Sequence, residues 1–211
     1  MLERLASIGL MFYALKMHKS SYPPVESSEQ ASAALSERRI VLKFGSRLLT
    51  GDSTELDPER MASVARAVAA EPKTEAVIVS SGAIEAGFRI LGHASPPKRI
   101  QDRQAAAAVG QGRLMSLWDD AFRAVGLKVA QVLLTNDCLT DRRRYIAASR
   151  ALGTLLTAGV VPIVNENDTV SVDEIVVGDN DNLAAATATL VDADVLALLT
   201  DVPGVMTGDP A

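Results

Sequence analysis

The chain has 211 residues, of which 48% are hydrophobic and 22% are charged, and its formal net charge is -5. This size and apolar content are typical of one globular domain with a substantial core, whereas the negative charge argues against a general nucleic-acid binder. Cys138 is the one cysteine, which excludes an internal disulfide and a cysteine-based zinc site. His18 and His93 lie far apart in the sequence, so we expect no metal site, and we expect a reducing, cytoplasmic location.

Residues 1–38 are predicted to form an N-terminal extension and a linker. The apolar patch at residues 8–15 is shorter than the roughly 20 residues that a membrane helix needs, and the acidic Glu3 disfavours a signal peptide. We therefore expect a docked or frayed helix within the first 19 residues and no membrane-spanning segment. Residues 20–36 are rich in Ser, Pro and Glu, a composition typical of linkers.

From residue 39 onward, short apolar runs alternate with longer segments of helical character. The runs of strand length cover residues 40–44, 76–79, 129–134, 160–164 and 195–199. The expected helices begin at the Asp57-Pro58 cap or cover residues 101–125, 145–158 and 183–190. Because the strands are mostly apolar on both faces, this alternation predicts an α/β domain over residues 39–211, a three-layer α/β/α sandwich with a mainly parallel sheet.

Polar loops follow four of the five predicted strands. In open parallel sheets, ligands bind beyond the carboxyl ends of the strands, so chemistry is expected in these loops. Glycine lets a backbone approach a ligand closely, and amide groups at a helix start favour anions. Lys43, at the end of a buried strand, needs a negative partner unless its long side chain reaches solvent. The loops begin KFGS at residue 43, SSGA at 80, NEND at 165 and TDVPG at 200, and they indicate phosphate on one side and a polar small molecule on the other.

Residues 178–182, with the sequence GDNDN, bring two carboxylates and two amides to the start of a predicted helix. They could serve only as caps and turn formers, or they could hold a metal, a lysine or an amino group. A calcium loop is excluded, because its sixth and twelfth positions would be Ala184 and Leu190 in place of Gly and Glu. The chain also contains neither a P-loop motif nor G-x-G-x-x-G.

Several segments, taken in order, resemble the glutamate 5-kinases of the amino acid kinase family. They include KFGSRLLT, VSSGAIEAG, QAAAAVGQGRLM, NENDTV, GDNDNLAA and LLTDVPGV, and the resemblance covers residues 39–211. NENDTV followed by GDNDNLAA is characteristic of the glutamate kinases within the wider family. The resemblance implies an amino acid kinase-like fold, and a reaction that moves the γ-phosphate of ATP to the γ-carboxylate of glutamate with the help of Mg²⁺. This reaction is the first step of proline biosynthesis.

The resemblance also implies which residues bind the nucleotide. Lys43 would be catalytic by neutralising the transferring phosphoryl group, and the amides around Gly45 and Ser46 would cradle phosphate. Thr200 and Asp201 match the nucleotide-binding pair of the family. Since the side chain of glutamate has a pKa near 4.3, its carboxylate is already an ionised nucleophile, and catalysis should depend on positive charge and positioning.

On the amino-acid side, the resemblance assigns four substrate-binding residues and a second catalytic one. Ser81 and Gly82, at a helix start, would bind glutamate together with Asp168 and Asn180. Asp168 can pair with the substrate ammonium. Asp181 matches the acid that orients the catalytic lysines.

The resemblance further implies proline as a feedback inhibitor at the glutamate site and a homo-oligomeric assembly. Residue 211 falls before further nucleotide-binding sequence and a second catalytic lysine of the family, so we expect the domain to be incomplete at its C-terminal end. The alternative function is therefore a fragment that binds glutamate or proline without phosphoryl transfer. The kinase half of a pyrroline-5-carboxylate synthase is disfavoured by the GDND form and the lack of reductase sequence, and a uridylate kinase is disfavoured by NEND with GDNDN.

Overall fold

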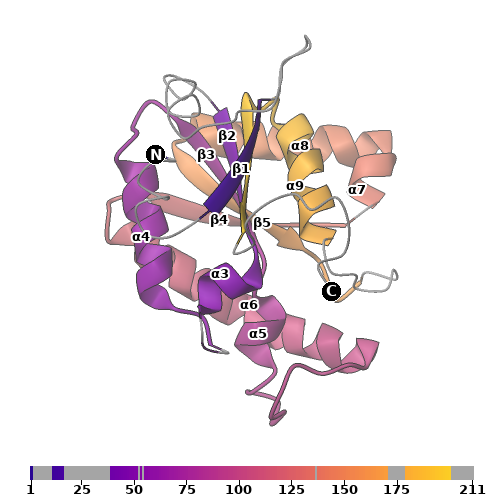
Figure 1. Cartoon of the computed structure of the whole chain (residues 1–211). Coiled ribbons are helices and arrows are strands. Elements are labelled where there is room, and N and C mark those ends of the chain that lie inside the picture. Colours follow the sequence, from indigo (N-terminus) through magenta and orange to yellow (C-terminus); the bar gives the residue numbers. More distant parts are fainter. Residues whose placement is uncertain are drawn as a thin grey trace.

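The structure, a computed structural model, describes residues 1, 11–16, 39–51, 53, 55–135, 137–170 and 179–200. Its centre is a six-stranded sheet with the strand order β1-β6-β2-β3-β5-β4 (Figure 1). The strands are β1 (Met11–Lys16), β2 (Arg39–Phe44), β3 (Glu75–Ser80), β4 (Lys128–Leu134), β5 (Val160–Glu166) and β6 (Val195–Thr200). All neighbouring pairs are parallel except β1 with β6, which confirms the mainly parallel sheet.

Helices cover both faces of this sheet, which confirms the three-layer arrangement. α4, α5 and α6 lie on one side of the sheet and α8 and α9 on the other (Figure 1). The helices are α3 (Ser46–Thr50), α4 (Pro58–Ala69), α5 (Ala83–Gly87), α6 (Ile100–Arg123), α7 (Asp137–Thr140), α8 (Arg142–Thr157) and α9 (Asp179–Leu190). Asp57 caps α4, as predicted, by accepting hydrogen bonds from two backbone amides of the first turn.

The N-terminus of α8 is capped in the same way by Asp141. Its carboxylate accepts hydrogen bonds from the backbone N–H groups of Arg143 and Arg144. The Arg144 amide lowers the pKa of Asp141 most, and burial opposes it only partly. Because this pKa is lowered, the capping contribution is present above the ordinary value of 3.8 and is lost as the pH falls through the native pKa.

The prediction of a helix within the first 19 residues is wrong for residues 11–16. Residues Met11–Lys16 form β1, which pairs antiparallel with β6 over six residues, from Met11 opposite Thr200 to Lys16 opposite Val195. β6 has β2 on its other side, so without β1 its outer row of backbone groups would lack partners. Pairing satisfies these groups, and this long-range effect overrides the local preference. The predicted linker at residues 20–36 lies outside the described residues.

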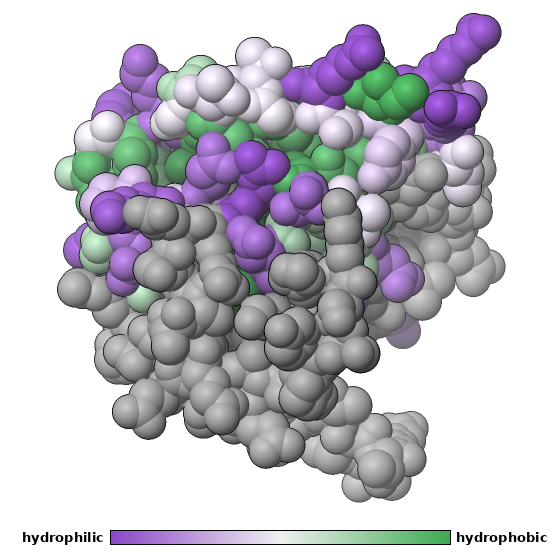
Figure 2. All heavy atoms as spheres, turned by 90° about the horizontal axis from the view of Figure 1, so that it is seen from above, coloured by the Kyte–Doolittle hydropathy of each residue, from purple (hydrophilic) through white to green (hydrophobic). Residues whose placement is uncertain are grey.

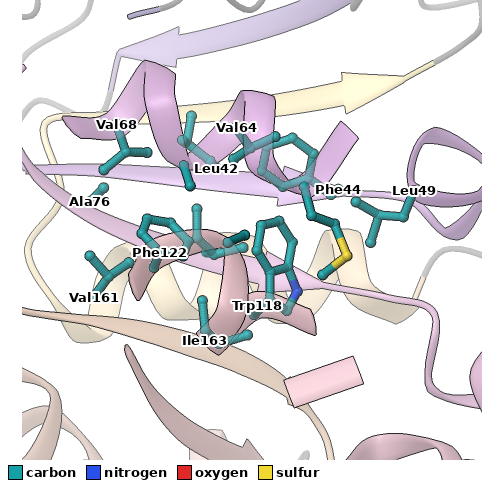
Figure 3. Close-up of a cluster of buried hydrophobic side chains, with 14 of the residues drawn as sticks. Leu42, Phe44, Leu49, Val64, Val68, Ala76, Trp118, Phe122, Val161 and Ile163 are labelled. Atoms are coloured by element: carbon teal, nitrogen blue, oxygen red, sulfur yellow. The ribbon is translucent and has the colours of Figure 1, made fainter. Parts of the chain in front are cut away.

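Two hydrophobic cores follow from the alternation of side chains along the strands. On β2, Leu42 and Phe44 belong to the core under α4 and α6, while Val41 belongs to the core under α8 and α9. In the first core, Trp118 lies between Phe44 and Phe122, with ring centroids 6.0 and 5.9 Å apart (Figure 3). The sheet is therefore buried on both faces, as expected for a parallel sheet.

The buried indole of Trp118 also makes a polar contact. Its Nε1–H donates a 3.0 Å hydrogen bond to Ser80 Oγ, and the Ser80 hydroxyl donates to the carbonyl oxygen of Ser81. Both side chains are fully buried, so these bonds satisfy groups that would otherwise be costly to bury. The contact ties α6 to the end of β3, where the predicted site begins.

α5 and α6 pack at an unusually short distance because glycines meet at their contact. A Cβ atom added at Gly110 would lie 1.9 Å from the carbonyl oxygen of Ala83, and one added at Gly87 would lie 1.9 Å from that of Ala106. Backbone atoms cannot move aside as a flexible side chain can. Any larger residue at these two positions must therefore push the helices apart.

The face of the described residues seen in Figure 2 mixes hydrophilic and apolar side chains. The view from above shows hydrophilic residues interspersed with apolar ones and with no sharp boundary between them (Figure 2). In the part of the chain that the structure describes, no helix combines the length and the apolar character needed to cross a bilayer.

The contact between α5 and α6 predicts opposite effects for two glycines of one helix. Gly110→Ala should lower the free energy of unfolding by about 3 kcal/mol, because the new methyl group overlaps backbone atoms. The matched control is Gly112→Ala, since no atom lies within 4 Å of a Cβ added at this exposed position. The control should raise the stability by up to about 1 kcal/mol through helix propensity. Urea unfolding would measure both, and equal effects would contradict the close packing.

Candidate active site

Lys43 and Asp181 form an ion pair where the end of β2 meets the first turn of α9. Lys43 Nζ lies 2.7 Å from Asp181 Oδ1, and the exposed side-chain fractions are 14% for Lys43 and 48% for Asp181. On β2, Lys43 alternates with residues of the α4 and α6 core, so its side chain lies on the α9 face of the sheet. The largely buried Lys43 side chain thus has the negative partner that the sequence led us to expect.

Ser81 and Asn180 meet on the same face. The Ser81 backbone N–H donates to the carbonyl oxygen of Phe44, which continues the parallel pairing of β3 with β2 by one residue. The Asn180 Nδ2 group donates to Ser81 Oγ. Because Asn180 and Asp181 are neighbours in α9, the Ser81 contact lies next to the Lys43 ion pair. The structure therefore brings together four predicted site residues.

A buried amide network links this group to α6. The Asn180 Nδ2 group also lies 3.4 Å from Asn165 Oδ1, at the end of β5. Asn165 is 3% exposed, and its Nδ2 donates a 2.9 Å hydrogen bond to Oε1 of Gln111, which is 9% exposed. The backbone N–H of Glu166 donates to Asn165 Oδ1 at 2.9 Å. Side chains from α9, β5 and α6, which belong to all three layers, are thus connected by hydrogen bonds.

Asp168 lines a pocket of about 270 Å³ next to this network. Its walls come from α6, the end of β4 and the residues that follow β5, and they include Gln111, Gln131, Glu166 and Asp168. With Asn167, the pocket has two carboxylates and three amides, which suit a small polar ligand with a positive group. Gln111, which also lines this pocket, is connected through Asn165 to Asn180, so the amide network joins the pocket to the Lys43 group.

Three other predicted residues lie at helix starts close to the strand ends. Gly45 precedes α3, which begins at Ser46, and a Cβ added at Gly45 would lie 3.8 Å from Lys43 Nζ. The backbone of Gly45, which carries no side chain, therefore lies next to the Lys43 ammonium group. Gly82 precedes α5 with a φ of +110°, a conformation that side chains rarely adopt, and Leu56 fills the space beside it.

The predicted nucleotide-binding pair is only partly described. Thr200 is the last residue of β6, but the structure does not describe its side chain, and Asp201 lies outside the described residues. The described residues also contain no cluster of three or more His, Cys, Asp or Glu side chains that could hold a metal ion.

The start of α9 differs from the prediction. The predicted helix covered residues 183–190, whereas α9 already begins at Asp179. Asn180 and Asp181 are therefore in the first helical turn and not in the preceding loop. Asp and Asn have low helix propensity but are favourable near a helix N-terminus, where carboxylates complement the helix dipole.

Comparison with known proteins identifies the class to which this architecture belongs. The model of the amino acid kinase family matches residues 38–211. The chain therefore belongs to the amino acid kinase family. Solved structures agree at the level of the fold. The isopentenyl phosphate kinase of T. acidophilum has a TM-score of 0.54 at 20% identity, covering 82% of this chain and 74% of its own. The aspartate kinase of Synechocystis has a TM-score of 0.52 at 19% identity, covering 82% and 30%.

Among curated proteins, the chain is similar to bacterial glutamate 5-kinases. That of Citrifermentans bemidjiense is 49% identical over 175 residues, which are 82% of this chain and 47% of the relative. That of Thermus thermophilus is 51% identical over 178 residues, or 83% and 48%. That of Myxococcus xanthus is 49% identical over 180 residues, or 85% and 48%. The resemblance seen in the sequence is confirmed, and the chain spans about half the length of these relatives.

Sequence reasoning missed two residues of the site. Asn165 was part of the NEND motif but had no assigned role, and Gln111 was read only as part of a long alanine-rich helix. Glutamines in such a helix are usually solvent-exposed, and only the tertiary structure reveals that Gln111 is buried against a strand end. A possible signal was the position of Gln111 among the apolar, inward-facing residues of α6.

The ion pair between Lys43 and Asp181 can be tested by a double-mutant cycle. Lys43→Met, Asp181→Asn and the double variant should show a coupling energy of up to about 1 kcal/mol in urea unfolding, since the aspartate is half exposed and solvent screens the pair. The same cycle with Lys43→Met and Asp192→Asn, in which the second residue follows α9, is the control and should show no coupling. A coupling energy of zero for both cycles would contradict the contact.

Proposed function

We propose that the protein catalyses the ATP-dependent phosphorylation of the γ-carboxylate of L-glutamate to L-glutamyl 5-phosphate, the first step of proline biosynthesis. The observation that carries this proposal is the placement of Lys43 and Asp181 directly beside Ser81 and Asn180. This arrangement sets a cation next to polar groups suited to an amino acid. The similarity to glutamate 5-kinases from several bacteria supports the choice of substrate.

In the proposed reaction, an oxygen of the glutamate γ-carboxylate forms a bond to the γ-phosphorus of ATP. The bond from that phosphorus to the bridging oxygen breaks, and ADP leaves with the electron pair. The carboxylate is ionised at neutral pH, so the reaction needs no general base. The main barrier is the repulsion between two anions, which Lys43 would reduce by placing positive charge at the transferring group. Asp181 would hold the lysine in position.

The surroundings of Lys43 fit the phosphate groups of ATP. The ammonium adjoins the bare backbone of Gly45, which leaves room for a close approach. Ser46 opens the short helix α3 next to it. We infer that Mg²⁺ accompanies the nucleotide and neutralises phosphate charge. None of the described residues is assigned to the ion.

On the amino-acid side, Asp168 and the pocket it lines would receive the substrate ammonium. Ser81 and Asn180 would contact the substrate, with Gly82 at the start of α5. We further infer that proline competes for this site as a feedback inhibitor, that the protein forms a homo-oligomer, and that it acts in the cytoplasm. The family resemblance supports these three inferences.

The role of Lys43 can be tested by separating turnover from binding. Lys43→Ala should lower the rate of glutamate-dependent ADP release by about 100-fold or more, because it removes the charge that stabilises the transferring phosphoryl group. Glutamate affinity, measured by calorimetry, should change by less than about threefold, since the ammonium serves the phosphoryl group. Coupled-enzyme detection of ADP measures the rate.

The matched control is Lys128→Ala, which removes an exposed lysine at the start of β4 and should leave both quantities unchanged. Equal turnover in Lys43→Ala and the parent chain would refute the catalytic role. If the parent chain binds glutamate or proline but releases no ADP with glutamate present, the alternative of an amino-acid-binding module is supported instead.

A further inference from the structure

The amide network between α6 and α9 has only one possible hydrogen-bond polarity. Side-chain amides can usually be turned by 180°, which exchanges oxygen and nitrogen. A backbone N–H cannot be exchanged, and that of Glu166 donates to the Asn165 side chain. The atom facing it must therefore be the oxygen Oδ1, and the Asn165 nitrogen must face Gln111.

The orientation of the Asn165 amide determines the orientation of the amides on both sides of it. Toward α6, the Asn165 Nδ2 group needs an acceptor, and Gln111 presents its Oε1 at 2.9 Å. Toward α9, Asn165 Oδ1 can only accept, so Asn180 must present its Nδ2 group. The same Nδ2 group donates to Ser81 Oγ. One backbone amide thus decides the orientation of three side-chain amides.

The Gln111 amide is oriented so that its oxygen satisfies Asn165, while its own nitrogen is left without a partner. Its Nε2 group is buried and has no hydrogen-bond partner among the described residues. A buried donor without a partner is costly. Turning the amide would not solve the problem, because it would set two donors against each other at Asn165. The position of the Gln111 amide is therefore explained by what Asn165 requires.

The consequence is a defined set of atoms facing the site. With its nitrogen engaged by Ser81 and Asn165, Asn180 has its oxygen Oδ1 left to accept a hydrogen bond. Since Ser81 Oγ accepts from Asn180, the Ser81 hydroxyl proton remains able to donate. An acceptor next to a donor suits a ligand that carries both a positive N–H group and a carboxylate, as an amino acid does.

We propose that Asn165, whose own orientation is fixed by the Glu166 backbone N–H, is a positioning residue that holds the Asn180 amide with its oxygen toward the ligand, so that the site selects an ammonium-bearing dicarboxylate over its deaminated analogue. This inference rests on the proposed function, because glutamate is taken as the ligand. Asn165 acts on the ligand through Asn180.

The test compares glutamate with glutarate, which keeps both carboxylates and lacks the ammonium. Calorimetry on the full chain gives the ratio of the two affinities. Asn165→Leu keeps the approximate shape but removes the Oδ1 acceptor that faces the Asn180 amide, so that this amide can turn. We expect the glutamate-to-glutarate ratio to fall about fivefold, as the loss of one net hydrogen bond allows. Gln101→Leu, an exposed change on α6, is the control and should leave the ratio unchanged.

Asn165→Asp provides a second variant, which keeps an acceptor at the same position. An aspartate still accepts from Glu166 and Asn180, and the unused Nε2 group of Gln111 can turn to donate to it. The ratio should therefore not fall in this variant. A purely structural role of the network would lower affinity for both ligands alike and leave the ratio constant.

The outcomes separate the two proposals. If the parent chain does not bind glutamate, the proposed function and this inference both fail. If it binds and prefers glutamate, but the ratio is the same in Asn165→Leu or falls in Asn165→Asp, the inference fails while the proposed function stands. A fall in Asn165→Leu only, with the ratio kept in Asn165→Asp, supports the inference.

Discussion

Lys43 places a positive charge in a nearly buried position at the end of a central strand, and the arrangement of the site depends on how that charge is stabilised. Its partner Asp181 belongs to the first turn of α9, which lies far along the chain from β2. The ion pair therefore fixes the start of α9 against the end of β2. Asn180, one residue earlier in the same turn, is brought to Ser81 by the same contact. One electrostatic interaction thus relates the side that would hold phosphate to the side that would hold an amino acid.

The hydrogen bonds around Asn165 complement this charge pair. An ion pair fixes a distance but is tolerant of rotation, whereas amides have distinct donor and acceptor ends. Together they determine where the groups lie and which atom each presents. The unsatisfied Nε2 group of Gln111 shows that this arrangement has a cost in stability. Such costs are common at functional sites, where local rules of satisfaction are broken in favour of geometry.

Much of the fold could be predicted because the relevant signals are local. The runs at residues 40–44 and 160–164 are apolar and of strand length, and they became β2 and β5 with small extensions at their ends. Asp57 followed by proline identified the start of α4 directly. The contact between Lys43 and Asp181 could also be predicted from the sequence, since a buried lysine requires an acidic partner. Features set by distant parts of the chain were missed: β1 forms because β6 has an open edge, and Gln111 is buried because β5 ends beside it.

The position of β1 has a consequence for any shortened form of the protein. β1 lies outside the part of the chain that matches the family model, which begins at residue 38. In a chain trimmed to that match, β6 would be an exposed edge strand, and the backbone N–H and C=O groups that now pair with β1 would lack hydrogen-bond partners. Exposed edge strands can pair with strands of other molecules, so the trimmed protein would be prone to oligomerise through its sheet. With β1 in place, β6 is paired on both sides, and the edges of the described sheet are β1 and β4.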